Sequence, residues 1–448
     1  SPFVVYGEDG FGKTSVMAKA IVQASQKFNK KPKPIIVHRF LREKTHATTF
    51  MESILHQLQL VSGKPTAVTG PLSQIELIHA FRKTLASVGA IQNVFLFVDG
   101  MENISERDNG LSFQWLPRLL PPGVRMVLCI NASCKTGLHA LQKRIQGKRA
   151  FSLKVRGLKE DEQTQFIERI LAKSKRTLSE AQLEVVQKLI GKTGNPLLLD
   201  YFSMTVSKWK SQSSLVQYSM SETVEGAFQD YLNELEHFFG VDPVSRVFSL
   251  LCVARHGWTT TEMLHLLSMD IDCIRSCEPQ QGGFLDSIKD VVRFPHHNWL
   301  RLAYAMRWAI QEEYSSLGMR WVLRHAVFRR ICLQRYISDE TQMARIHRGI
   351  CKFLSGSSVS GQMVNLFPSR GGPERFVFFG HPQQPLIYQF HVVEESQTTR
   401  LLRGSQINER KVRELPYHQV LSKEITTLRQ TLHSVEFVQA KCAIGEIE

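Results

Sequence analysis

A glycine-rich loop near the start of the chain limits its possible folds more than any other feature. The apolar segment Phe3–Tyr6 leads into the loop Gly7–Thr14, which reads G-x-x-x-x-G-K-T, and apolar residues at helical spacing follow it. A strand, this loop and a helix in that order form a phosphate-binding loop, the Walker A motif. Its glycines let backbone N–H groups face phosphates, and the helix N-terminus adds positive potential. The residues expected to hold a nucleotide are Gly7, Glu8, Asp9, Gly10, Phe11, Gly12, Lys13, Thr14 and Ser15.

Four side chains have specific expected roles at this site. Lys13 is expected to reach the β- and γ-phosphates, and Thr14 to offer its hydroxyl to Mg²⁺. The segment Val94–Asp99 is a continuous apolar run, typical of a strand buried on both faces, and it ends in the second expected metal-binding residue, Asp99. Glu102 follows and would polarise the attacking water, which makes Asp99 and Glu102 the candidate catalytic pair. The alternative for Glu102 is an exposed loop carboxylate.

Further apolar segments alternate with helical patterns along the first third of the chain. This alternation predicts a doubly wound parallel sheet of five strands, in which one strand lies between the strands of the two nucleotide motifs. Asn131 and Ser133 follow one of these strands, and either could sense the γ-phosphate or form an ordinary strand-end turn. The other expected strands are Ile35–Phe40, Arg125–Ile130 and Phe151–Val155.

After Val155 the pattern is helical. The sequence Gly194-Asn195-Pro196 indicates a helix end, a turn and a new helix with proline in its first turn. Residues 355–385 are rich in turn-forming residues and predict a flexible insertion between helices.

The Walker A loop, Asp99-Gly100-Met101-Glu102 and Gly194-Asn195-Pro196 together resemble a STAND-class P-loop NTPase with a NACHT domain. The resemblance implies bound ATP or ADP with Mg²⁺, and it places Pro196 against the adenine base. Many NACHT proteins have a second acid where this chain has Asn103, so slow ATP hydrolysis, or binding without turnover, is expected.

The same resemblance implies a winged-helix domain, in which His325 touches the nucleotide phosphate in the closed state; a surface or interdomain histidine is the alternative. The C-terminal helices resemble those of NACHT-and-WD-repeat proteins and of the telomerase-associated vault protein. The expected architecture is an α/β P-loop NTPase domain followed by all-α helical and winged-helix domains. The expected boundaries are 1–156 for the NTPase domain, 157–221 for the helical domain, 222–340 for the winged helix and 341–448 for a helical C-terminal region.

Charge and cysteine content limit the partners. The net charge is +15, so acidic partners are possible, and a run of arginines without intervening acids could bind phosphate backbones or form a solvated or interdomain face. The eight dispersed cysteines are expected to be reduced, which favours an intracellular protein of the cytoplasm. The spacing of Cys273, Cys277, His296 and His297 is unusual for zinc. No apolar run is long enough to predict a membrane span, and the chain has the look of a piece of a longer protein. The arginine run comprises Arg320, Arg324, Arg329, Arg330 and Arg335.

Two functions follow from these features. The first is a regulatory switch, in which ATP or ADP controls opening, self-association and contact with protein partners. The second is an ATP-driven machine that acts on nucleic acid or within a ribonucleoprotein. No guanine-reading Asn-Lys-x-Asp motif occurs, which favours ATP over GTP.

Overall fold

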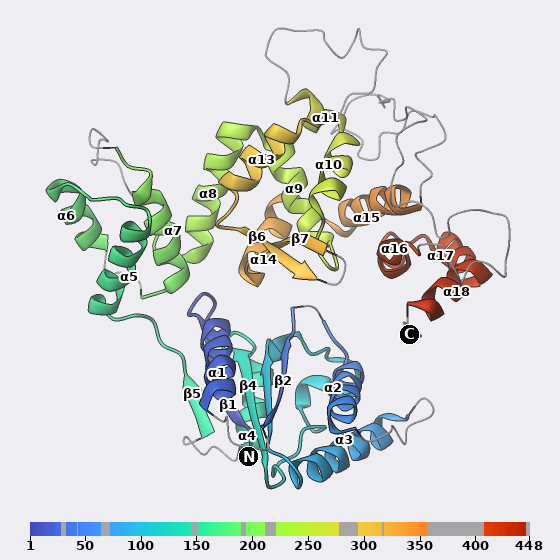
Figure 1. Cartoon of the computed structure of the whole chain (residues 1–448). Helices are drawn as coiled ribbons and strands as arrows, with labels where there is room; N and C mark the ends of the chain where they lie inside the picture. Colours follow the sequence, from blue (N-terminus) through green and yellow to red (C-terminus); the bar gives the residue numbers. More distant parts are fainter. Residues whose placement is uncertain are drawn as a thin grey trace. The chain divides into compact units, whose positions relative to one another are not determined.

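The computed structural model of the chain forms two compact units, Ser1–Val224 and Glu225–Glu448 (Figure 1). Each unit has its own core. The four expected domain ranges stay predictions, because the division of the structure into two units does not test them. The structure describes residues 1–27, 33–42, 44–63, 72–145, 151–189, 194–210, 221–276, 294–315, 318–355 and 407–444.

The first unit contains a parallel five-stranded sheet with the order β2-β3-β4-β1-β5. The predicted α/β sheet is confirmed, including the position of β4 between β1 and β3, the two strands of the nucleotide motifs. The carboxyl ends of β1, β3 and β4 therefore lie side by side, which is where ligands bind in such sheets. The strands are β1 (Phe3–Gly7), β2 (Ile35–Phe40), β3 (Val94–Asp99), β4 (Val124–Asn131) and β5 (Ser152–Lys154).

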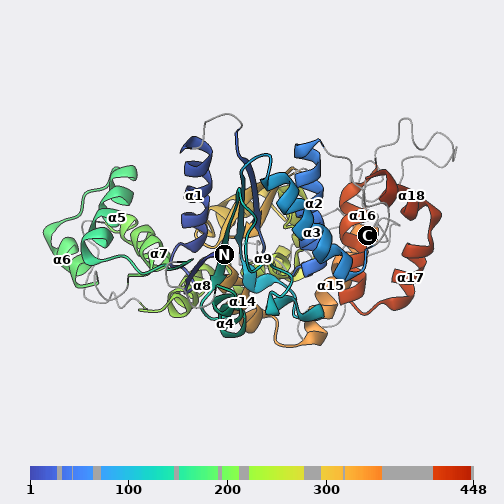
Figure 2. The same cartoon turned by 90° about the horizontal axis from the view of Figure 1, so that it is seen from below.

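Helices cover both faces of this sheet, which explains the continuous apolar run of β3. Helix α1 (Lys13–Lys27) packs Met17 against Phe97 on one face. On the other face, α2 (Ala47–Ser62) and α3 (Gln74–Gly89) pack against Leu96. Figure 2 shows α1 on one side of the strands and α2 and α3 on the other. The short helices near the strand ends are η1 (Met101–Asn103), η2 (Arg107–Ser112) and α4 (Lys135–Arg144).

Three helices complete the first unit and bury a small core of their own. This core includes Ile167, Val186 and Phe202. Helix α7 begins at Pro196, as the turn sequence predicts, and Asn195 caps it by accepting a hydrogen bond from the Leu197 N–H at 2.9 Å. The three helices are α5 (Glu160–Lys173), α6 (Glu180–Leu189) and α7 (Pro196–Ser207).

The second unit has a winged-helix arrangement. An antiparallel hairpin, β6 (Ile310–Ser315) and β7 (Gly318–Leu323), follows helix α13 (His296–Ala305). A capping box formed by Thr259 and Glu262 starts α10. The apolar residues of segment 283–294 could form wing strands, but this segment lies outside the described residues except for Phe294. The other helices are α8 (Val224–Phe239), α9 (Val241–Val253), α10 (Thr260–Ser268), α11 (Ile271–Arg275), α14 (Ala326–Tyr336), α15 (Glu340–Ser355), α16 (Glu409–Leu421), α17 (Ile425–His433) and α18 (Val435–Ala443).

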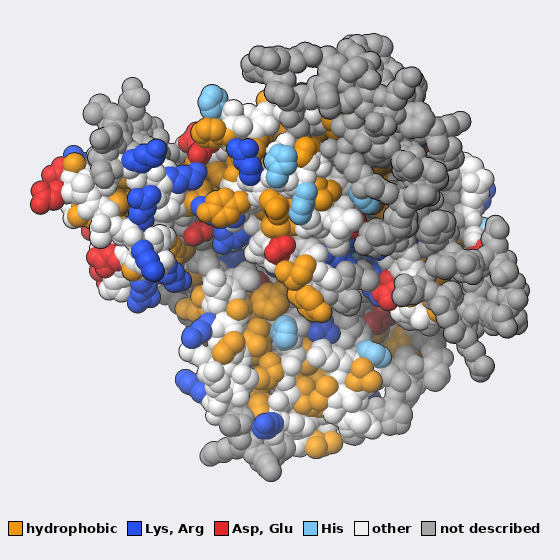
Figure 3. All heavy atoms as spheres, turned by 45° about the horizontal axis from the view of Figure 1, so that its top comes forward, with side chains coloured by type: hydrophobic (Ala, Val, Ile, Leu, Met, Phe, Trp, Pro, Cys, Tyr) orange, Lys and Arg blue, Asp and Glu red, His pale blue; other side chains and the backbone are white. Residues whose placement is uncertain are grey.

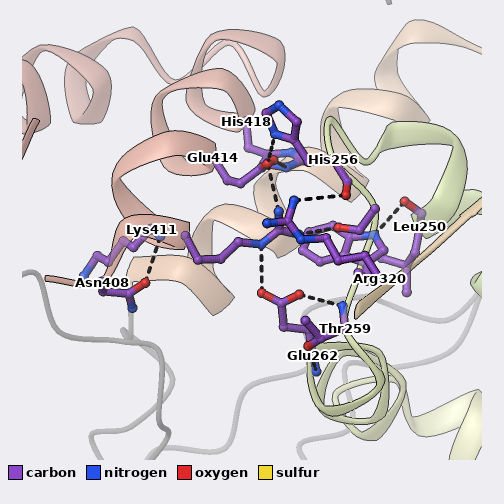
Figure 4. A network of polar contacts seen from close by, with 12 residues as sticks. Leu250, His256, Thr259, Glu262, Arg320, Asn408, Lys411, Glu414 and His418 are labelled. Atoms are coloured by element: carbon purple, nitrogen blue, oxygen red, sulfur yellow. Dashed lines mark hydrogen bonds and ion pairs between the residues drawn. The ribbon is translucent and has the colours of Figure 1, made fainter. Parts of the chain in front are cut away.

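A buried ionic network holds α16 against the winged helix (Figure 4). Arg410, which is 7% exposed, donates to Glu262 at 2.8 Å and to Glu414 at 2.9 Å. Glu414 also lies 2.6 Å from the ring Nδ1 of His256, and His418 lies one turn further along α16. We call Arg410, Glu262, Glu414, His256 and His418 the α16 network.

The predicted arginine run contacts its own unit, and one member is buried. Arg320 is 3% exposed, which corrects the expectation of a solvated face at that position. It donates to the His256 carbonyl, and Arg324 and Arg329 donate to the Trp308 and Cys252 carbonyls. Arg330 pairs with Glu225 and Arg335 with Glu236, both at 2.6 Å. On the face drawn in Figure 3, blue Lys and Arg side chains of α5–α7, at the left, are mixed with red Asp and Glu side chains.

Candidate nucleotide site

The Walker A loop connects β1, which ends at Gly7, to α1, which begins at Lys13. Gly10 and Gly12 have φ angles of 80° and 83°, in the left-handed region that favours glycine. A Cβ on Gly10 would also lie 2.6 Å from Oδ1 of Asn195. Glycine is therefore required at position 10 for two separate reasons, one conformational and one steric.

Thr14 and Asp99, the two predicted metal ligands, lie in direct contact. The Thr14 hydroxyl donates to Oδ2 of Asp99 at 2.6 Å, and Asp99 is 8% exposed. A hydroxyl and a carboxylate oxygen at the mouth of the sheet are donors of the kind that Mg²⁺ prefers, so these residues fit the expected ion. No group of three or more His, Cys, Asp or Glu within the described ranges is placed to hold a metal. Cys277, of the set weighed for zinc, lies outside those ranges.

Glu102 lies beside the end of β4 in a half-buried position on η1. Its Oε2 accepts a hydrogen bond from the Asn131 backbone N–H at 3.0 Å. Burial raises the pKa of Glu102, although hydrogen bonds to backbone N–H groups and the Lys13 charge oppose this shift. The carboxylate is therefore held at the sheet edge rather than fully exposed.

Lys13 is directed back onto its own loop. Its Nζ donates to the Glu8 carbonyl at 2.7 Å, and the Phe11 N–H donates to the same carbonyl at 3.4 Å. The Glu8 side chain is exposed, as is that of Ser15 on the first turn of α1. The ammonium group has three N–H donors, so this contact leaves donors for a phosphate.

Of the two candidate sensors, Asn131 is the one built into the site. It is 8% exposed, and its Nδ2 donates to the Asp9 carboxylate of the Walker A loop. Ser133 is exposed, and its backbone N–H donates to Oδ1 of Asn131 at 3.0 Å. Asn131 therefore contacts both the loop and, through its backbone, Glu102.

The turn before α7 contacts the Walker A loop through Asn195. Nδ2 of Asn195 donates to the Asp9 carbonyl at 2.9 Å. Beside this contact, the Gly194 carbonyl accepts a hydrogen bond from Leu158 at 2.7 Å, and a Cβ on Gly157 would lie 2.9 Å from that same carbonyl. The sequence singled out Pro196 in this turn and missed Asn195, whose only signal was its helix-capping position.

Cys129 is a second residue that the sequence did not connect with the site. It is buried on β4, and burial together with the neighbouring Asp99 carboxylate raises the pKa of its thiol. The thiol therefore stays protonated beside the expected metal ligand.

His325 lies in the second unit, at the N-cap of α14, with its ring 5.4 Å from that of Phe328. Its expected contact with the nucleotide phosphate stays a prediction, as does the contact of Pro196 with adenine. None of the helices in the described parts of the chain is long and apolar enough to cross a membrane.

Two parts of the sequence match known families. Residues 1–138 match the family described as "AAA domain", and residues 211–344 match "NWD1-like, winged helix-turn-helix domain". The second match spans the hairpin β6–β7 and the helices around it, and it supports the winged-helix reading of that region.

Curated relatives match across most or all of the chain. Human "NACHT domain- and WD repeat-containing protein 1" is 25% identical and covers 100% of this chain, which spans 28% of that protein. Human "NACHT and WD repeat domain-containing protein 2" is 22% identical over 80% of this chain and 20% of its own length. Mouse "Telomerase protein component 1" is 22% identical over 59% of this chain and 10% of its own length. The predicted resemblance to NACHT-class P-loop NTPases is confirmed.

Among solved structures, the chain aligns weakly with the Walker-type ATPase of Pyrococcus abyssi. It aligns with a TM-score of 0.33 and 10% identity, covering 74% of this chain and 90% of that chain. The Aeropyrum pernix ORC1 protein in complex with DNA aligns with a TM-score of 0.32 and 15% identity, covering 77% and 88% of the two chains.

Proposed function

We propose that this chain is an ATP-binding regulatory switch of the NACHT class, in which ATP or ADP sets whether the module is closed or open for assembly. The single observation that carries the proposal is the 2.6 Å contact between Thr14 and Asp99. It joins the Walker A helix to the end of β3, 85 residues away in sequence, in the relation that a Mg²⁺–nucleotide site requires.

Each site residue then has a defined task. Lys13 and the N–H groups of the loop bind the phosphates, and Thr14 and Asp99 hold Mg²⁺. When bound, Mg²⁺ neutralises phosphate charge. Glu102 orients a water and accepts its proton, and Pro196 and His325 complete the nucleotide site in the closed state. Hydrolysis is slow, because Asn103 stands where the resemblance to NACHT proteins implies a second acid.

The output of this switch is protein contact. The opened module associates with further copies of itself and with protein partners, in the cytoplasm. The relatives named for NACHT and WD repeats support this reading, although this chain spans only 28% and 20% of their lengths.

The alternative, an ATP-driven machine on nucleic acid or in a ribonucleoprotein, has the telomerase-component relative in its favour. Against it stands the arginine run, whose members contact carbonyls and carboxylates of their own unit. A strong stimulation of ATP hydrolysis by DNA or RNA would reverse this preference.

The decisive experiment compares Lys13→Ala with Lys19→Ala in equilibrium binding of a fluorescent ATP analogue. Lys19 is exposed on the same helix, so its loss removes an equal charge outside the loop. Charge-assisted hydrogen bonds contribute roughly 1.5–3 kcal/mol, so Lys13→Ala is expected to weaken binding by about 10–100-fold and Lys19→Ala by less than about twofold. Equal affinities in wild type and Lys13→Ala would refute the assignment.

A further inference from the structure

The carboxylate of Asp9 stands out because it lies inside a loop meant to hold phosphates. Its side chain accepts a hydrogen bond from Nδ2 of Asn131, at the end of β4. Its backbone carbonyl accepts another from Asn195, in the turn before α7. The backbone of Asp9 is therefore positioned by Asn195, while its negative charge is directed toward the end of β4.

The orientation of the Asn131 amide follows from its partners. A carboxylate only accepts hydrogen bonds and a backbone N–H only donates, so Nδ2 has to face Asp9 and Oδ1 has to face the Ser133 N–H. Asn131 also pairs with Gly7 in the sheet register and lies beside Glu102 through its backbone N–H. Asn131 therefore lies at the sheet edge between the Walker A loop and Glu102, and its side-chain amide is a hydrogen-bond donor there.

We infer that Asp9 is a specificity-determining residue that lowers the affinity of this site for ATP relative to ADP. This inference rests on the proposed function. A third phosphate group brings added negative charge to the region that Asn131 borders. Either Asn131 leaves Asp9 to donate to that phosphate, and the hydrogen bond to Asp9 is lost, or it donates to both, and two negative groups share one amide. Both routes disfavour ATP, whereas ADP leaves the Asp9–Asn131 pair intact.

The test is the ratio of two affinities in Asp9→Asn. The amide keeps the shape of Asp9 and can still accept from Asn131, while the carbonyl bonded to Asn195 is part of the backbone and remains. The control is Glu52→Gln, which removes the same charge from an exposed side chain on α2, outside the nucleotide site. Binding of a non-hydrolysable β,γ-methylene ATP analogue and of ADP, both with Mg²⁺, is measured for the whole chain by calorimetry.

We expect the ratio of ATP-analogue affinity to ADP affinity to rise roughly tenfold in Asp9→Asn, the size of about one charge-assisted interaction. Glu52→Gln should change the ratio by less than about twofold. Circular dichroism checks folding, and Asp9→Ser replaces Asp9→Asn if the latter does not fold. An unchanged ratio in Asp9→Asn, or an equal rise in Glu52→Gln, would overturn the inference while leaving the proposed function standing. A wild-type chain that binds neither nucleotide would overturn both.

Discussion

At the scale of single residues, Asp99 has the clearest expected effect. Asp99→Asn keeps the shape of the side chain but removes the charge that would hold Mg²⁺. We expect nucleotide affinity in the presence of Mg²⁺ to fall roughly tenfold or more, and affinity without Mg²⁺ to change little. Titrations with Mg²⁺ and with a chelator measure the difference. Equal losses under both conditions would mean that Asp99 acts only on the fold.

Glu102 is expected to act on turnover rather than binding. Glu102→Gln retains an acceptor for the Asn131 N–H but no longer accepts a proton from water. ATP binding should be unchanged, and single-turnover hydrolysis should slow by about 10²–10⁴-fold. Glu106→Gln, an exposed carboxylate on the following loop, is the control. Hydrolysis at the wild-type rate in Glu102→Gln would remove Glu102 from the mechanism.

The sequence predicted the position of the nucleotide site but not all of its hydrogen bonds. Gly7–Thr14 and Asp99 follow from local patterns, because a strand, a glycine-rich turn and a helix can be read within a few residues. The choice between Asn131 and Ser133 needed the structure, since both follow the same strand. The contact of Asn195 with Asp9 joins residues 186 positions apart, and no local pattern encodes such a contact.

At the scale of helices and strands, the α16 network makes a testable claim about the second unit. Arg410→Met would leave the buried carboxylates of Glu262 and Glu414 without their guanidinium partner. The removal of one partner from a buried ion pair costs about 3–5 kcal/mol, so the urea midpoint of the second unit should fall clearly. Arg348→Met is the control, because its pair with Glu424 is 49% and 28% exposed and is worth about 0–1 kcal/mol. Equal shifts in both variants would contradict this account.

The helices of the second unit supply partners for the arginine run that the sequence alone does not reveal. A sequence shows which residues are charged but not where their side chains point. A run of arginines without acids therefore resembles a binding surface. The acids that pair with Arg330 and Arg335 lie on α8, about a hundred residues earlier. The carbonyls that accept from Arg320 and Arg329 belong to the chain around the end of α9.

At the scale of the whole molecule, the buried histidines predict how stability depends on pH. Burial lowers the pKa of His347 to about 3 and also lowers that of His418; their Nδ1 atoms lie 2.7 Å apart. Burial acts to raise the pKa of Glu414, but hydrogen bonds with His256 and His418 and the Arg410 charge outweigh it and hold that pKa well below its usual range. The groups that face the pair also include Arg255, on the chain before α10, and Arg329 on α14.

A histidine whose pKa is lowered on folding stabilises the fold above its unfolded pKa of about 6.5 and loses this contribution as the pH falls toward 3. The His347 contribution should therefore decrease by roughly 2 kcal/mol between pH 7 and pH 5. Denaturation midpoints at pH 7, 6 and 5 measure this slope. His347→Gln should flatten it, whereas His433→Gln, at an exposed position, should not. A slope unaffected by His347→Gln would place the pH dependence elsewhere.

The close approach of Gly157 and Gly194 affects how this sequence can vary over evolutionary time. Neither position has room for a methyl group, because a Cβ on Gly157 would lie 2.9 Å from the Gly194 carbonyl and a Cβ on Gly194 would lie 2.6 Å from that of Leu158. A substitution at either glycine would push the turn that carries Asn195 away from the Walker A loop. We therefore expect evolution to retain Gly157 and Gly194 together, while the surface of α5–α7 varies.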